Sequence, residues 1–293
     1  MIFRLGLLCL FLNLSIGCFR LDANLYNNDN SIDAYRWDAY DGHVDFVLDS
    51  SYDIPAPEFN YFTLESNNAG DRKTIHALYL GDMANITTDT VILYCHGNRD
   101  HMDFYWPRAK LLANGGYGIL MFDYRGYGLS EGEPSESGLY ADTRAAIQWL
   151  ADNGVSNNQL IFYGFSMGSA PCTKYAAEPF LLTPSKLILE APFASAEVMV
   201  QDGTLLAIPG SYVTNLKINN VENIKKVTQP LMWIHGYEDI DLALKTHGEV
   251  VFKNHGGSSR KALRVTAGTH NNLPEKIGFL NYLNQISDFV INY

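Results

Sequence analysis

The sequence Gly164-Phe165-Ser166-Met167-Gly168 joins an apolar, strand-like run at 159–163 to a helical pattern at 167–178. A Gly-x-Ser-x-Gly sequence between a strand and a helix is typical of a nucleophile elbow, whose glycines relieve the crowding around a strained serine. Such a turn lifts the Ser166 hydroxyl clear of the sheet and points the Met167 N–H at a developing oxyanion. We therefore predict Ser166 as a nucleophile and Met167 as an oxyanion-hole residue. The alternative is an ordinary glycine-rich turn between strand and helix.

Short apolar runs recur on both sides of this turn, separated by segments with helical periodicity. Continuous apolar runs suit central parallel strands that are covered by helices on both faces. The alternation therefore predicts an α/β fold with a mostly parallel central sheet flanked by helices, preceded by a hairpin. The hairpin strands are expected at 59–65 and 74–80, and the later strands at 90–95, 118–123, 159–163, 186–190, 231–235 and 262–266. The helices are expected near 104–113, 139–152, 167–178, 241–253 and 275–291.

A serine nucleophile needs a base, and the position of His270 favours it among the eight histidines. His270 lies just past the last predicted strand, where a loop at the carboxyl edge of a parallel sheet can bring it over the serine. His96 and His235 each precede a glycine at a strand end, which favours a role in stabilising a turn. The remaining histidines are expected at surface or packing positions: His43, His76, His101, His247 and His255.

The base in turn needs an acid that orients it. Asp239 follows the predicted strand at 231–235, so it falls at the sheet edge where the base must be held. Three rival carboxylates remain open at this point. Glu238 and Asp241 are close neighbours in the same loop, and Glu190 ends the preceding strand.

These motifs together resemble the α/β-hydrolase superfamily, over a region from about Phe59 to the end. The resemblance also rests on the sequences Cys95-His96-Gly97-Asn98, Asp123-Tyr124-Arg125-Gly126-Tyr127-Gly128-Leu129-Ser130, His235-Gly-x-x-Asp239 and Gly268-x-His270. They are similar to the small-lid serine hydrolases, which include lysophospholipase-like esterases and serine aminopeptidase-like proteins. The resemblance implies a Ser166–Asp239–His270 triad, Asn98 as the second oxyanion-hole residue, and a lid at 194–229.

The implied reaction is a two-step acyl transfer through an acyl-enzyme, with no metal or organic cofactor. Apolar residues in the expected lid favour an acyl ester as the small-molecule substrate; they are Val198, Met199, Val200, Leu205, Leu206, Ile208, Pro209 and Tyr212. A serine peptidase is an alternative, and it would need Glu190 or Glu238 to hold a substrate amine. A noncatalytic binding protein on the same fold is a second alternative.

Composition limits the other classes of function. The 293 residues carry 21 basic and 32 acidic side chains, a net charge of −11, which argues against a nucleic-acid partner. The body contains only Cys95 and Cys172, too few for a disulfide framework and without metal-ligand spacing, so both are expected to be buried thiols.

The first eighteen residues have the pattern of an export signal. Arg4 precedes an apolar run at 5–12, and Ser15-Ile16-Gly17-Cys18 resembles the lipobox of bacterial lipoproteins. We expect an exported protein, anchored to the membrane by acylation of Cys18; a cleaved secretory signal or an uncleaved anchor are the alternatives. Residues 19–53 are expected to form a polar spacer whose later half packs on the body, and residues 54–293 to form the hydrolase domain.

Overall fold

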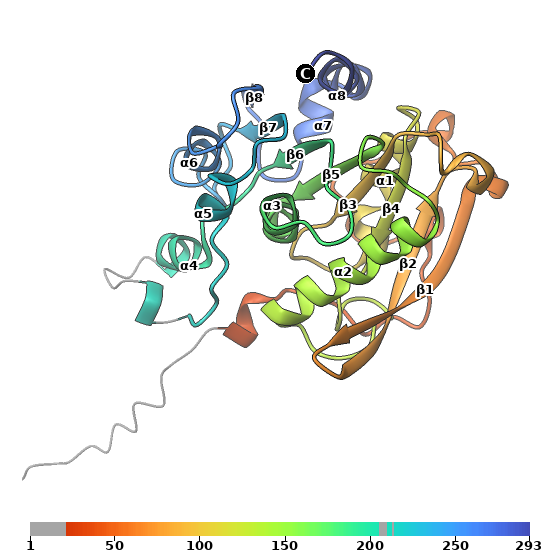
Figure 1. The fold of residues 1–293 in the computed structure, drawn as a ribbon, viewed down its shortest axis with the longest axis horizontal. Helices are drawn as coiled ribbons and strands as arrows, with labels where there is room; N and C mark the ends of the chain where they lie inside the picture. Colours follow the sequence, from red (N-terminus) through yellow and green to blue (C-terminus); the bar gives the residue numbers. More distant parts are fainter. Residues whose placement is uncertain (1–21, 205–209, 213) are drawn as a thin grey trace, which may run out of the picture.

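The computed structural model describes residues 22–204, 210–212 and 214–293. Within these residues, eight strands form one sheet in the order β1-β2-β4-β3-β5-β6-β7-β8 (Figure 1). β1 and β2 form an antiparallel hairpin, β2 pairs antiparallel with β4, and all the remaining pairs are parallel. The strands are β1 (Phe59–Asn68), β2 (Asp71–Leu80), β3 (Val91–Cys95), β4 (Gly118–Phe122), β5 (Leu160–Phe165), β6 (Lys186–Glu190), β7 (Leu231–Gly236) and β8 (Arg260–Val265). The predicted α/β fold with a mostly parallel sheet is confirmed.

Helices cover both faces of the sheet, and each face has its own buried apolar cluster. Side chains of α2 (Glu136–Asp152), α3 (Ser169–Ala177), α5 (Asn220–Ile224) and α6 (Gly248–Lys253) belong to one cluster. Side chains of α1 (Met102–Ala113), α7 (Leu273–Ile277) and α8 (Phe279–Asn292) belong to the other. This two-faced burial explains why the central strands have continuous apolar sequences. No helix among the described residues is long and apolar enough to cross a membrane.

Two predicted helices differ from the structure for local reasons. The helix expected at 241–253 begins only at Gly248, because the main-chain N–H groups of Asp241 and Leu242 donate to the Asp239 carboxylate in a turn. The helix expected at 275–291 is divided at Gly278, whose φ of 84° lies in the left-handed region.

The segment at 22–53, expected to begin as a solvated spacer, packs on the domain along its length. Tyr35 and Phe46 are buried in the apolar cluster beneath α1 and α8. Three of its acidic residues are partners of buried cations: Asp45 pairs with Arg108, while Asp38 and Asp53 pair with Lys110. Packing of the later half was expected, but the first half also contacts the domain, where Asp22 accepts from Thr214 and Asn27 accepts from Asp100, so the expectation of a solvated start is wrong. The predicted leader at 1–18 lies outside the described residues.

The predicted lid region, between β6 and β7, contains α4 (Ala196–Thr204), the short 3₁₀ helix η7 (Gly210–Tyr212) and α5. In this segment, Met199 packs against the core, Val200 is buried, and Tyr212 is 71% exposed. The lid residues Leu205, Leu206, Ile208 and Pro209 lie outside the described residues.

Candidate active site

Ser166 stands at a strained turn between β5 and α3. Its φ of 51° lies in the left-handed region, which non-glycine residues rarely adopt. A Cβ on Gly168 would lie 1.9 Å from the carbonyl oxygen of Cys95, and a Cβ on Gly164 would lie 2.6 Å from the carbonyl oxygen of Gly168. Both positions therefore require glycine, as the elbow interpretation predicts.

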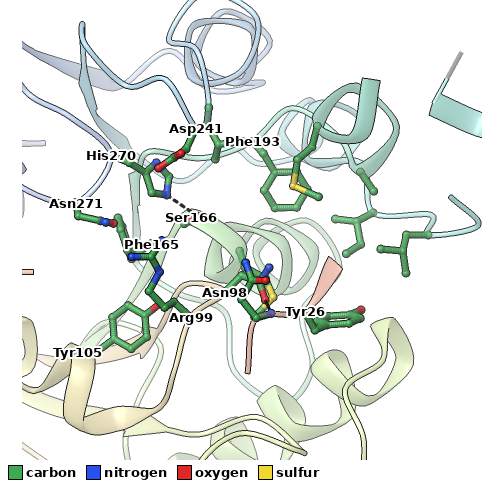
Figure 2. Close-up of a pocket in the computed structure, with 17 residues that line it drawn as sticks. Tyr26, Asn98, Arg99, Tyr105, Phe165, Ser166, Phe193, Asp241, His270 and Asn271 are labelled. Atoms are coloured by element: carbon green, nitrogen blue, oxygen red, sulfur yellow. Dashed lines mark hydrogen bonds between the residues drawn. The ribbon is translucent and has the colours of Figure 1, made fainter. Parts of the chain in front are cut away.

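Ser166, His270 and Asp239 form one hydrogen-bonded row at the carboxyl edge of the parallel strands. The Oγ of Ser166 lies 2.9 Å from Nε2 of His270, and Nδ1 of His270 lies 2.8 Å from Oδ2 of Asp239. Figure 2 shows His270 directly beside Ser166, with the dashed line between them. With its proton on Nδ1, the imidazole donates to Asp239 and accepts from the serine hydroxyl. The structure therefore brings the three predicted residues together in nucleophile–base–acid geometry.

Asp239 is held as a carboxylate by several donors. It accepts the N–H groups of Asp241 and Leu242, at 3.0 and 2.8 Å, and lies 3.1 Å from Nε2 of His235. Burial alone would raise the pKa of Asp239. Hydrogen bonds from His235 and His270 outweigh burial and hold the pKa of Asp239 well below its usual value.

The three rival carboxylates have other surroundings. Glu190 is fully buried, and its carboxylate accepts from Arg108, Tyr163 and Tyr282. Glu238 is exposed and does not line the pocket beside Ser166. Asp241 is exposed and does line that pocket. Of the candidates, only Asp239 is hydrogen-bonded to His270 among the described residues.

The described residues contain one group close enough to hold a metal ion, formed by Asp239, Asp241 and His270. Two of its three members already hydrogen-bond each other, and His270 also contacts Ser166. This arrangement fits the triad better than a metal centre, so we assign no metal there.

Two further histidines, His96 and His235, hydrogen-bond main-chain carbonyl groups in their own turns. Nδ1 of His96 lies 2.7 Å from the carbonyl oxygen of Gly97, and Nε2 of His235 lies 2.8 Å from that of Leu242, so both stabilise turns as expected. His101, His247 and His255, expected at exposed or packing positions, are all buried.

The two predicted oxyanion-hole residues, Asn98 and Met167, both line the pocket that contains Ser166 and His270. Met167 directly follows the serine in the first turn of the helical segment, where main-chain N–H groups lack intrahelical acceptors. Asn98 follows β3 at the same edge of the sheet. Its side chain is held by Leu25, Asn27 and Tyr127.

The pocket has a volume of about 240 Å³ and an uneven lining. One side is apolar and is formed by the connection between β6 and β7. Its residues are Phe193, Ala196, Met199, Leu216 and Ile218. The other side carries Arg99, Asn271 and Tyr105 (Figure 2).

Reasoning from sequence missed two residues of the pocket, Tyr26 and Asn27, which reach it from the N-terminal segment. The available signal was Tyr26, an aromatic residue within a polar tract.

Comparison with known proteins identifies the class. The fold is that of the α/β hydrolases, and the chain matches the family model described as Hydrolase_4, serine aminopeptidase S33, over residues 87–246. The chain therefore belongs to this family of the α/β-hydrolase superfamily. The segment at 22–53 lies outside the match.

Among its relatives, the uncharacterized protein MT2364 of Mycobacterium tuberculosis is 31% identical over 201 residues, which are 68% of this chain and 69% of that protein. The uncharacterized protein YfhR of Escherichia coli O157:H7 is 33% identical over 151 residues; this match spans 50% of this chain and about half, 52%, of that relative. The Pyrococcus furiosus esterase Pf2001 shares the fold with a TM-score of 0.67 at 16% identity, over 92% of this chain and 98% of that one.

Proposed function

We propose that this protein is a serine hydrolase that cleaves carboxylic acyl esters. The hydrogen-bonded row of Ser166, His270 and Asp239 beside a pocket carries the proposal. His270 takes the serine proton as Oγ attacks the ester carbonyl, and then returns it to the leaving alcohol. Asp239 holds the imidazole in the required tautomer and stabilises its charged form. Water then attacks the carbonyl of the acyl-enzyme as His270 takes its proton; the bond to Oγ of Ser166 breaks, the proton returns to Oγ, and the carboxylic acid leaves.

The main-chain N–H groups of Asn98 and Met167 would stabilise the tetrahedral oxyanion. One such donor contributes roughly 3–4 kcal/mol to transition-state stabilisation in comparable sites. The apolar side of the pocket supports an acyl substituent, because burying each methylene of a chain contributes about 0.8 kcal/mol. The five apolar side chains offer no partner to a free amine, and Asp241 is the carboxylate that lines the pocket.

A serine peptidase is less well supported, because neither carboxylate considered for a substrate amine is available. Glu190 is enclosed by Arg108, Tyr163 and Tyr282, and Glu238 does not reach the pocket. Asp241 does line the pocket, so aminoacyl substrates belong in the test.

Turnover of p-nitrophenyl esters and aminoacyl p-nitroanilides by purified protein separates these functions. The wild type should hydrolyse the esters, and Ser166→Ala should reduce turnover to the background rate. Ser258→Ala, which changes an exposed serine outside the pocket, is the matched control. Faster turnover of aminoacyl substrates than of esters would favour the peptidase. Full activity in Ser166→Ala would rule out Ser166 as the nucleophile.

We also propose, from the leader sequence, that the protein is exported and acylated on Cys18. Two or more acyl chains on one cysteine suffice for stable membrane anchoring. Wild type should then partition with membranes, whereas Cys18→Ala should be released or remain unprocessed. An intact mass that begins at an unmodified residue other than Cys18 would favour plain secretion.

A further inference from the structure

The segment from Leu25 to Asp29, called the N-terminal strap below, runs along the edge of the pocket. It pairs in parallel with Asp100: the N–H of Asp100 donates to the carbonyl of Asn27 at 3.0 Å, and the N–H of Asp29 donates to the carbonyl of Asp100 at 3.2 Å. The N–H of Gly128 donates to the carbonyl of Asp29 at 2.7 Å. The strap is thus bound to the loop that contains Asn98 by regular main-chain hydrogen bonds.

The chain immediately before the strap is also held in place, because Asp22 binds the lid region. The carboxylate of Asp22 accepts from the hydroxyl of Thr214 at 2.6 Å and from the N–H of Asn215 at 2.9 Å. These contacts join the start of the N-terminal segment to the lid region. The strap therefore spans the pocket edge between two points of attachment, and its path is set by the domain.

The strap clamps the side-chain amide of Asn98. The N–H of Asn27 donates to Oδ1 of Asn98 at 3.1 Å, and Nδ2 of Asn98 donates to the carbonyl of Leu25. The hydroxyl of the buried Tyr127 donates to the same Oδ1 at 2.6 Å. With three hydrogen bonds from different directions, the amide has one orientation. Figure 2 shows Tyr26 of the strap next to Asn98, below Ser166.

We infer that the N-terminal strap positions Asn98 for oxyanion stabilisation, an inference that rests on the proposed function. The side chain and the main-chain N–H of Asn98 share one Cα, so fixing the amide restricts rotation of the peptide that carries the N–H. An oxyanion-hole donor is effective only when it is held in place before the charge develops. The strap residues are positioning residues: they act on the reaction through Asn98.

Asn27→Pro compared with Asn27→Ala tests this inference. Both remove the Asn27 side chain, but only proline removes the N–H that donates to Asn98, and both keep the carbonyl that accepts from Asp100. We expect kcat for p-nitrophenyl acetate to be about tenfold lower in Asn27→Pro than in Asn27→Ala, with KM changed less than threefold. The loss of kcat should be smaller than the 10²–10³-fold that removal of an oxyanion donor costs. Asn27→Pro removes the N–H of residue 27, but it only displaces the main-chain N–H of Asn98, which is the oxyanion donor.

Asn98→Ala provides the second arm, because it keeps the main-chain N–H and removes the clamped amide. It should lower kcat by a similar factor, and in its background the proline and alanine variants at position 27 should have equal kcat. Thermal unfolding of each variant monitors the fold.

Equal kcat in Asn27→Pro and Asn27→Ala would overturn the inference. So would a tenfold gap that persists in the Asn98→Ala background, or full kcat in Asn98→Ala. Failure of the proposed function looks different, since Ser166→Ala would then retain ester hydrolysis.

Discussion

The guanidinium of Arg108 lies 2.6 Å from the carboxylate of Glu190, measured from Nη1 to Oε1, and both side chains are buried. Arg108 also donates to the carbonyl of Asn271, next to His270, and lies 4.1 Å above the ring of Phe165, next to Ser166. Burial would lower the pKa of Arg108, but the carboxylates of Glu190 and Asp45 outweigh burial and raise it well above its usual value. The buried Arg108–Glu190 pair thus contacts the neighbours of both Ser166 and His270, and the Glu190 carboxylate is already bound by Arg108, Tyr163 and Tyr282.

Glu190→Gln should therefore destabilise the fold. Loss of one partner of a buried pair leaves the other charge uncompensated, and the free energy of unfolding should fall by about 3 kcal/mol. The exposed Glu238→Gln is the matched control and should change it by less than about 0.5 kcal/mol. Urea unfolding of both variants checks this; equal stability would refute a structural role for Glu190.

Asp239→Asn should lower kcat by about 10⁴-fold, because the amide favours the wrong tautomer of the histidine. Asp241→Asn should cost far less, since Asp241 lines the pocket without a hydrogen bond to His270 among those described. Steady-state kinetics on one short ester compares the two variants. The opposite order would make Asp241 the catalytic acid.

The lowered pKa of Asp239 predicts how stability depends on pH. A carboxyl whose folded pKa lies below its ordinary value of 3.8 stabilises the fold above that value, and the contribution is lost as pH falls toward the folded pKa. The difference in unfolding free energy between wild type and Asp239→Asn should thus stay nearly constant from pH 6 to about 4 and shrink as the pH falls further. Urea unfolding at each pH measures it, and a difference that grows toward acid pH would contradict the account.

Met199→Trp should shorten the preferred acyl chain, because Met199 lines the apolar side of the pocket. The ratio of kcat/KM for the octanoate ester to that for the acetate ester should fall about tenfold, the equivalent of losing roughly two buried methylenes. Val198→Trp lies on the same helix outside the pocket lining, so it should leave the ratio near that of the wild type. Equal ratios in the two variants would place the acyl chain elsewhere.

The elbow, the strands around it and the loop positions of Asp239 and His270 could be predicted because each depends on local sequence. Glycines at 164 and 168 are required by a turn only five residues long, and apolar runs mark buried strands. The role of the N-terminal segment could not be predicted in the same way. Its acidic and amide residues are typical of a solvated tract, and their partners, Asn98, Arg108 and Lys110, lie far along the chain.

Covalent labelling with a fluorophosphonate probe tests the central claim most directly, because the probe reacts only with a serine activated by its base. Intact mass spectrometry of wild type, Ser166→Ala and Ser258→Ala should show one adduct on wild type and on Ser258→Ala, and none on Ser166→Ala. Peptide mapping should place the adduct on Ser166. An adduct of equal yield on Ser166→Ala, or none on the folded wild type, would contradict the proposal that Ser166 is the nucleophile.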